Sequence, residues 1–382
     1  MMSDATVSEA GTPVVAILTM DDPARGFRGN RNNFIDLIEA GKQAGLTIYV
    51  TTVQNLKLHA SRIIGYSYNG VTKSWERRWF PLPQVVYNRI PEREDEWIPE
   101  VRQKIEECLA HPNVRLFNQS FFSKWLLFKW LRSSRKTRRF VPLTRKYDPA
   151  MKLLPLMRKY PFLYLKPEKG KAGKGIMRIS RQTGNRGYQL DAQEKNAKTV
   201  YRYPTLRQLK ERLNAMIGNQ EYIVQQGIRL ASYKSRPFDL RVLVQKNSRG
   251  VWTVTGIGAR LAGELSITTH VPRGGSIENP RRLLTSHFSA ERAANILRRA
   301  RRSALIIARQ IERASKAELG ELSLDLGVDR QARIWFFEAN AKPMKFDEPD
   351  IRRKSLARLM QYCKYLTGKK HGSLRQDKPK SG

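Results

Sequence analysis

The sequence predicts a protein that combines α/β and α+β parts, and three stretches carry this prediction. Near its start a β-branched strand, a helix and a second strand follow one another, which argues for a parallel βαβ lobe. In the middle, a strand that ends at Lys166 runs into a glycine-rich turn. Near the end, two apolar runs flank a short polar connection and read as a β-hairpin. A chain of 382 residues can hold these parts as two or three lobes.

Composition narrows the class of protein. A hydrophobic content of 40% is ordinary for a globular chain. The 71 Lys and Arg residues outnumber the 34 Asp and Glu residues, and the net charge of +37 favours polyanions, acidic partners or phosphorylated ligands. Only Cys108 and Cys363 are present, without metal-ligand or CxxC spacing, which fits a reducing compartment. No signal-peptide core or run of transmembrane length occurs, so the sequence predicts a cytoplasmic protein without a membrane partner.

The N-terminal lobe is expected to span residues 13–118, after a flexible start at residues 1–12. Its predicted elements alternate between strands and helices, as in a parallel sheet. They are a strand at 14–19, a helix at 34–40, strands at 46–50 and 84–90, a helix at about 95–109 and a strand at 114–117.

The next stretch contains the first candidate phosphate contacts. Lys124 lies in an amphipathic helix at 121–131, where a solvated helix face is the simpler explanation for its charge. Lys166 ends an apolar strand that Pro167 stops, so its ammonium group emerges at the edge of the core. A glycine-rich turn follows, and its backbone amides can close over a phosphate, although a plain hairpin turn is the alternative. The glycines are Gly170, Gly173 and Gly175, and the motif is neither a Walker A loop nor a dinucleotide fingerprint.

The central part is a series of strands followed by helices. A strand from Glu221 runs into Gly227, where free backbone groups can pair with a base edge. On a strand at 238–245, Asp239 and Arg241 share one face, and a structural ion pair between them is the simpler reading. Another strand, at 252–260, ends at Arg260. Helices are expected at about 290–314 and 351–366, and residues 369–382 form a basic tail that we expect to be disordered.

The hairpin near the end is the candidate metal site. Its strands are Leu322–Val328 and 334–340, and alternation places Phe336, Glu338 and Asn340 on one face. Asp325 then lies almost opposite Glu338, and two facing carboxylates repel each other unless a cation lies between them. Asp, Glu and Asn oxygens suit Mg²⁺. The alternative is a surface hairpin whose carboxylates pair with Lys and Arg.

In this order the pieces resemble the ATP-grasp superfamily, and within it the YheC/YheD-like family linked to bacterial endospores. The resemblance covers about residues 14–366. It depends on the ordered set and not on any one motif: Tyr87–Ile90, Lys124 with Trp125, Leu165–Pro167 with the glycine-rich loop, Ile223–Ile228, Phe238–Val242, and Asp325 with Glu338 and Asn340.

The resemblance implies an ATP-grasp fold, in which two α+β subdomains grip ATP behind an N-terminal βαβ pre-ATP-grasp lobe. The ATP-grasp domain would span 119–368, with a linker helix, an ATP-lid subdomain at about 150–225 and a C-terminal subdomain at about 226–368. Lys124, Lys166 and the glycine loop would contact phosphates. Gln225, Gln226, Gly227 and Ile228 would form the adenine hinge, although many relatives have Glu where Gln225 stands. Arg241 and Arg260 would stabilise the γ-phosphate or an acylphosphate, and Asp325, Glu338 and Asn340 would bind Mg²⁺.

The implied reaction is an ATP- and Mg²⁺-dependent ligation of an unknown carboxylate to an amine through an acylphosphate. Two other functions stay open. One is a nucleotide-binding structural protein associated with the spore coat. The other is a polyanion- or nucleic-acid-binding protein, which the charge and the Arg-rich helix favour, although no zinc-finger, homeodomain or RNA-recognition signature is present.

Overall fold

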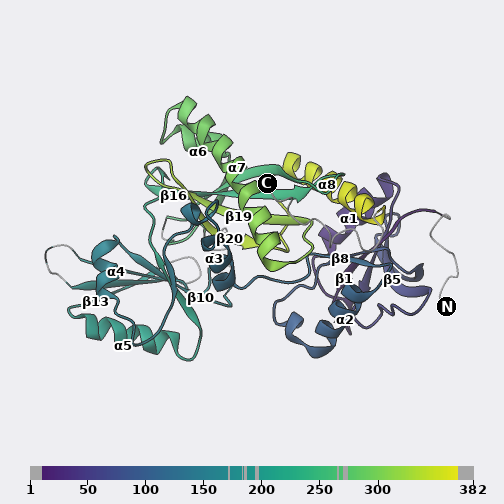
Figure 1. Ribbon diagram of the computed structural model, residues 1–382, viewed down its shortest axis with the longest axis horizontal. Helices are drawn as coiled ribbons and strands as arrows, with labels where there is room; N and C mark the ends of the chain where they lie inside the picture. The colour runs from purple at the N-terminus through teal and green to yellow at the C-terminus, as the bar shows by residue number, and fades with distance from the viewer. Residues whose placement is uncertain are drawn as a thin grey trace, which may run out of the picture.

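The protein forms three lobes arranged in a row, each built on its own β-sheet (Figure 1). The computed structural model describes residues 11–170, 173–182, 184, 187–193, 198–264, 266–269 and 274–368. Most of the expected flexible N-terminus and all of the expected basic tail lie outside the described residues. The fold is the predicted mixture of α/β and α+β parts.

The first lobe contains a six-stranded sheet in the order β6-β5-β4-β1-β7-β8. As expected for a βαβ start, β1 pairs in parallel with both β4 and β7. The hairpin of β5 and β6, which the sequence analysis did not identify, extends the sheet on one side. The elements of this lobe are β1 (Val14–Thr19), β2 (Asp21–Asp22), β3 (Gly26–Phe27), α1 (Arg31–Gln43), β4 (Thr47–Thr52), β5 (Arg62–Asn69), β6 (Ser74–Pro81), β7 (Val85–Asn88), η1 (Asp95–Trp97), α2 (Pro99–Ala110) and β8 (Arg115–Phe117).

One predicted helix of this lobe is divided in the structure. The expected helix at 95–109 is a short 3₁₀ turn, η1, followed by α2, which begins at Pro99. Ile98 between them has extended backbone, with ψ at 128°. A residue that precedes proline is disfavoured in the helical region, and proline suits the first turn of a helix. The sequence Ile98-Pro99 therefore ends one helix and begins the next.

The second lobe is an antiparallel sheet in the order β13-β12-β11-β10-β14-β9, covered by α4 and α5. The glycine-rich loop connects β10 to β11, which pair as a hairpin. Pro167 does not stop β10 but forms its last residue, opposite Tyr222. The linker and lobe elements are α3 (Lys124–Arg132), η2 (Arg138–Phe140), β9 (Thr144–Lys146), α4 (Leu154–Lys159), β10 (Leu163–Pro167), β11 (Met177–Arg181), β12 (Tyr188–Gln193), β13 (Lys198–Tyr203), α5 (Leu206–Ile217) and β14 (Tyr222–Gln226).

The third lobe is an antiparallel sheet in the order β18-β17-β16-β19-β20. The 26-residue helix α7 covers one face of it, packed with α3 into the largest apolar core of the described residues. The elements are β15 (Ser232–Tyr233), β16 (Arg236–Lys246), β17 (Trp252–Leu261), β18 (Ser276–Glu278), α6 (Pro280–Thr285), α7 (Ala290–Ser315), β19 (Glu321–Val328), β20 (Ile334–Asn340) and α8 (Pro349–Thr367).

Helix α8 joins the third lobe to the first. It contacts β16 and β17 on one side and α1 and β7 on the other. Its residues Leu359, Tyr362 and Leu366 belong to the same apolar core as Val15 and Phe117 of the first sheet. The two lobes therefore share a core, and the second lobe projects from them (Figure 1). None of the helices in the described ranges is both long enough and apolar enough to cross a membrane.

Candidate functional site

A cavity of about 600 Å³ lies between the second and third lobes. Both lobes and α3 contribute to its wall, so residues far apart in the sequence meet there. Nine of the predicted site residues line it: Lys124, Lys166, Gly170, Gly173, Gln225, Gln226, Ile228, Asp325 and Glu338. The other five predicted site residues are not in its wall: Gly175, Gly227, Arg241, Arg260 and Asn340.

Lys166 is held inside the cavity by its strand. On β10, Tyr164 and Lys166 alternate with buried Leu163 and Leu165, so both point away from the core of the second lobe. The Lys166 ammonium group donates to Gln225 Oε1 at 2.7 Å and lies 5.6 Å from the centre of the Phe337 ring. Burial lowers the pKa of Lys166 to about 8, although the Glu338 carboxylate opposes this shift. A buried ammonium with one neutral acceptor is available to an anion.

Lys124 reaches the same cavity from α3. Ser123 caps that helix, and the Glu168 carboxylate accepts from the backbone N–H of Trp125 at 3.1 Å. The Lys124 ammonium group donates to the carbonyl oxygens of Pro167, at 3.2 Å, and Gly170. Lys124 is thus tied to the glycine-rich loop and does not project from a solvated helix face.

The glycine-rich loop forms one edge of the cavity. Gly173 and Gly175 have φ values of 73° and 74°, a conformation that glycine adopts without strain. Gly175 also has Tyr222 close by, since its carbonyl accepts from the Tyr222 hydroxyl at 3.0 Å. The sequence predicts that the loop closes its backbone amides over a phosphate, and residues 171–172 of it lie outside the described residues.

The strand β14 leads into the predicted hinge. The Gln225 side chain is buried between Lys166 and Thr144, whose hydroxyl accepts from Gln225 Nε2 at 2.9 Å. The backbone N–H groups of Gln226 and Gly227 donate to Leu143 and Phe162. Within the described residues the N–H of Ile228 has no acceptor, and Ile228 lines the cavity. Of the N–H groups of Gln226, Gly227 and Ile228, only that of Ile228 therefore lacks an acceptor among the described residues.

The two carboxylates of the hairpin face each other, as the sequence predicts. Asp325 of β19 is paired with Glu338 of β20. The expected sharing of a face by Phe336 and Glu338 is wrong, because the register shifts between Asp325 and Leu326 and leaves Phe337 as an extra residue. Phe336 is fully buried in the core, whereas Phe337 and Glu338 both line the cavity. A β-bulge redirects side chains in this way.

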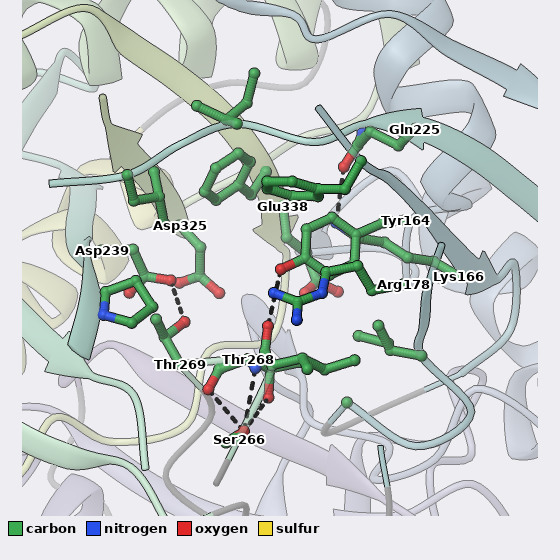
Figure 2. A pocket seen from close by; sticks show the side chains of 18 of the residues that line it. Tyr164, Lys166, Arg178, Gln225, Asp239, Ser266, Thr268, Thr269, Asp325 and Glu338 are labelled. Carbon is green, nitrogen blue, oxygen red and sulfur yellow. Dashed lines mark hydrogen bonds between the residues drawn. The ribbon is translucent and has the colours of Figure 1, made fainter. Parts of the chain in front are cut away.

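Asp239 of β16 adds a third carboxylate to the cavity, beside Asp325 (Figure 2). It does not form the expected ion pair with Arg241, because its carboxylate accepts from the Thr269 hydroxyl. Burial, together with the charge of Asp325, raises the pKa of Asp239 to about 7. The Arg241 guanidinium instead lies over Phe346, at 4.8 Å from the ring centre.

Only one of the two carboxylate oxygens of Asp325 has a partner among the residues that the structure describes. Its Oδ2 is 3.4 Å from Arg260 Nη1, whereas its Oδ1 is buried without a hydrogen-bond partner. Asp239 Oδ1 is also buried and unpartnered, and Glu338 makes no hydrogen bond or ion pair with the rest of the described chain. Unsatisfied carboxylate oxygens of this kind are costly to bury, and a cation would satisfy them. The residues thus fit Mg²⁺.

The protein alone would supply only part of a metal's shell. In the described ranges no three His, Cys, Asp or Glu side chains form a group that could hold a metal ion. Mg²⁺ prefers six oxygens and usually keeps water and phosphate among them. The arrangement therefore suits Mg²⁺ that arrives with a phosphate ligand, with Asp325, Glu338 and Asn340 as the predicted protein ligands.

Sequence reasoning missed several residues that shape the cavity. Arg178 lies opposite Tyr164 on β11 and is bound to Asp191 at 2.8 Å. The Tyr164 hydroxyl donates to Ile267 O at 2.9 Å, so the segment after β17 touches the second lobe (Figure 2). Gln193 accepts from the backbone N–H of Ile267 at 2.9 Å. Alternation on β10 could have indicated Tyr164, whereas the loop contacts had no local signal.

Comparison with known proteins gives consistent results. Residues 113–366 match the family described as YheC/D like ATP-grasp. The chain is 28% identical over 366 residues to the endospore coat-associated protein YheD of Bacillus subtilis (strain 168). The aligned residues cover 94% of this chain and 79% of that protein. The chain is 18% identical to YheC of the same organism, over 87% of this chain and 91% of that protein.

Two solved structures show the same fold. The ATP-grasp ligase PsnB, complexed with a minimal precursor, matches with a TM-score of 0.53 at 12% identity, over 93% of this chain and 100% of that one. D-alanine–D-alanine ligase from Bacillus anthracis matches with a TM-score of 0.51 at 12% identity, over 93% of this chain and 95% of that one. At this identity the likeness concerns the fold.

Proposed function

Because the chain belongs to the YheC/D-like ATP-grasp family, we propose that it is an ATP- and Mg²⁺-dependent ligase that joins a carboxylate to an amine. One observation carries the proposal. Two lysines and two facing carboxylates, Lys124, Lys166, Asp325 and Glu338, meet in one cavity between two lobes. Cations on one wall and carboxylates on the other are what a metal-bound polyphosphate requires.

In this proposal each group has a defined part. Lys124 and Lys166 bind phosphate oxygens, and the free N–H of Ile228 meets the adenine. Asp325, Glu338 and Asn340 hold Mg²⁺, which neutralises charge on the transferring phosphoryl group. The substrate carboxylate attacks the γ-phosphorus, ADP leaves, and an acylphosphate forms. An amine then attacks the acyl carbon, releases inorganic phosphate and loses a proton.

The two predicted catalytic arginines, Arg241 and Arg260, are each held by another side chain of the protein. Arg260 is bound to Asp325, and Arg241 lies over Phe346 with its Nε buried and unpartnered. We propose that Arg260, through its position beside the cavity residue Asp325, stabilises the charge of the phosphoryl group as it transfers, and that Arg241 does so once it leaves Phe346, because neither guanidinium is in the wall of the cavity in this state.

A structural role at the spore coat is the second candidate, because the chain resembles YheD over most of its length. In that case the cavity would bind nucleotide without turning it over, and the protein would associate with the forming endospore. The unsatisfied carboxylate oxygens suit bound Mg-nucleotide in both candidates, so turnover distinguishes them.

The first prediction is that Mg-ATP stabilises the fold. A ligand that binds only the native state adds about 2.7 kcal/mol to the free energy of unfolding at a hundredfold excess over its Kd. Thermal unfolding with ATP, with Mg²⁺ and with both would measure this, and calorimetry would give the Kd. No change at saturating Mg-ATP would contradict the proposal.

Turnover separates the two candidates. Purified protein would be incubated with ATP, Mg²⁺ and pooled amino acids and peptides, and phosphate release would be followed against a control without the pool. Pool-dependent release supports the ligase. Binding of Mg-ATP without any release under these conditions would favour the structural role.

A further inference from the structure

A dense arginine surface lies outside the cavity, and nothing in the proposed reaction uses it. Helix α7 exposes seven arginines to solvent, of which Arg292 and Arg313 donate hydrogen bonds to Gln331 and Gln310, and the segment at the end of α3 exposes five more basic residues. We call the other five arginines of α7 and these five residues the arginine surface: Arg298, Arg299, Arg301, Arg302, Arg309, Arg132, Arg135, Lys136, Arg138 and Arg139. Charged residues in a row on a helix most often form a solvated face. The arginine surface differs from such a face in the residues that surround it.

Acidic residues that could neutralise this surface are missing from its own segments. There is no Asp or Glu between Glu291 and Glu312, nor between Glu107 and Asp148. Glu312 is already occupied, because it pairs with Lys246 at 2.6 Å and accepts from the Trp252 indole at 2.7 Å. Within the described residues, none of the arginine-surface side chains forms an ion pair. Uncompensated like charges concentrate a positive potential.

The two segments meet in space. Gln310 of α7 donates to the carbonyl oxygen of Trp130 at 2.9 Å, close to the end of α3. Arg313 in turn donates to Gln310 Oε1, which brings the α7 face beside that end of α3. The two helices lie next to each other in Figure 1. The arginines therefore extend over neighbouring elements and do not belong to one isolated helix.

The part of the arginine surface on α7 is on the opposite side of the third sheet from the carboxylates of the cavity. On β16, Leu240, Val242 and Val244 pack into the core that contains α7. Asp239, at an alternate position, lines the cavity. A ligand on the outer side of α7 would thus not occupy the cavity, and its binding can be tested separately.

The chemistry of the surface selects the class of partner. In the part of the chain that the structure describes, no exposed large hydrophobic side chain lies on α7 or within 132–139. A folded protein partner would normally contribute an apolar interface core, and a single strand would stack bases on aromatic side chains. An arginine guanidinium group can donate two parallel hydrogen bonds to one phosphate group. A regular phosphate backbone needs cations alone.

We propose that the arginine surface binds the phosphate backbone of a duplex nucleic acid without reading its sequence. A helix of 26 residues is about 39 Å long at ~1.5 Å per residue. Its arginines from Arg298 to Arg309 extend over about 17 Å of this length, which matches about 5 base pairs of a duplex that rises about 3.4 Å per base pair. No base-reading motif is required for this kind of contact.

The experiment compares two variants with equal loss of charge. The first carries Arg298→Gln, Arg299→Gln, Arg301→Gln and Arg302→Gln, because Gln keeps helix propensity close to that of Arg. The control carries Lys57→Gln, Arg62→Gln, Lys73→Gln and Arg77→Gln, four exposed cations of the first lobe. Binding of a mixed-sequence 24-base-pair DNA and of poly-L-glutamate would be measured by fluorescence anisotropy from 50 to 200 mM salt. Mg-ATP binding would confirm that both variants are folded.

For the first variant we expect a loss of DNA affinity of about tenfold or more at 100 mM salt. The slope of log K against log salt should shrink by about 2–4, since each phosphate contact contributes about 0.9. The control should stay within about threefold of the parent. Equal losses in both variants would overturn the proposal, because binding would then follow net charge alone. Tighter binding of poly-L-glutamate than of DNA would overturn it in favour of an acidic polypeptide.

Discussion

At the scale of single residues, the cavity brings together groups that are unstable alone. Asp325 and Asp239 each have a buried carboxylate oxygen without a partner, and burial lowers the pKa of the Lys166 ammonium group to about 8. Burial of such groups costs free energy unless a ligand of opposite charge completes them. In the proposed function, phosphate and Mg²⁺ would complete these groups.

The metal ligands can be tested through Glu338. Replacement by Gln removes a charge with little change in volume, so Mg²⁺ should bind less well and the affinity for ATP in the presence of Mg²⁺ should fall about tenfold or more. ATP affinity without Mg²⁺ should change little. The matched control is Glu264→Gln, which alters another carboxylate in the wall of the cavity. Equal Mg²⁺ dependence in the parent and in Glu338→Gln would remove Glu338 from the metal site.

The pH dependence of ATP binding follows from Lys166. Its pKa is lowered to about 8 by burial, so the nucleotide-free protein loses this charge as the pH rises through 8. The Kd for Mg-ATP should therefore rise above about pH 8. The free energy of unfolding responds in the opposite direction. Between about pH 8 and the ordinary lysine value the unfolded chain binds more protons, so this group makes the folded state more stable as the pH rises.

The variant Lys166→Met separates this group from others that titrate. Met keeps much of the aliphatic stem and removes the ammonium, so the variant should fold normally and bind Mg-ATP more weakly. Calorimetric titrations from pH 6.5 to 9.5 should show a Kd that no longer rises near pH 8. An unchanged affinity, or an unchanged pH profile, would assign the effect to another residue.

At the scale of elements, the site depends on two irregular places in the sheets. The bulge at Phe337 turns Phe336 into the core and leaves Phe337 with Glu338 at the cavity, although simple alternation would place Phe336 and Glu338 on one face. The junction after β14 depends on close backbone approach, since a Cβ added at Gly227 would lie 2.0 Å from the Phe162 ring and 2.5 Å from its carbonyl oxygen. Both features are needed for the two lobes to present their residues to one cavity.

Gly227→Ala should therefore separate β14 from β10. The added methyl group cannot be accommodated by a side-chain movement alone, because the Phe162 carbonyl is also the acceptor of the Gly227 N–H. We expect the free energy of unfolding to fall by about 1–3 kcal/mol, as for other overpacked positions, and Mg-ATP to bind more weakly. Urea denaturation without nucleotide measures the first effect. Gly70→Ala is the control, since a Cβ there meets nothing within 4 Å; equal stability of the two variants would contradict the prediction.

At the scale of the molecule, the first lobe is attached to the ATP-grasp region by buried polar contacts as well as by α8. Lys342, just after β20, donates to Asn88 Oδ1 at 2.8 Å, Ile90 O at 3.2 Å and Glu96 Oε1 at 2.5 Å. Asn118, which follows β8 of the first lobe, donates to the carbonyl oxygens of Glu321 and Ala341 in the third lobe. These contacts fix the position of β20, which carries Glu338, relative to the first lobe.

Lys342→Met should lower the free energy of unfolding by about 3–5 kcal/mol, because it leaves the Glu96 carboxylate buried without its cation. The double variant Lys342→Met with Glu96→Gln removes that stranded charge and should be more stable than the single one. Urea denaturation of all three proteins forms the comparison. A double variant as unstable as Lys342→Met would show that the lost contacts to Asn88 and Ile90, and not the unpaired charge, determine the effect.

The sequence by itself determined the βαβ start, the hairpin near the end and the residue types of the two walls. The βαβ start, the pairing of Asp325 with Glu338 and the positions of Lys124 and Lys166 follow from local patterns: apolar periodicity, turn residues and hairpin geometry act over a few residues. The ordered set of motifs then indicated the ATP-grasp fold, which the comparisons confirm.

Only the tertiary structure decided which residues meet. The Phe337 bulge, the contact of Asp239 with Thr269 and the bond from Tyr164 to Ile267 join elements far apart in the chain, and no local pattern encodes them. The sequence Ile98-Pro99 could have predicted the division of the 95–109 helix. No local sequence pattern predicts that α7 packs against the third sheet. Packing of three lobes against one another sets these contacts, because burial is shared among segments that are not neighbours in sequence.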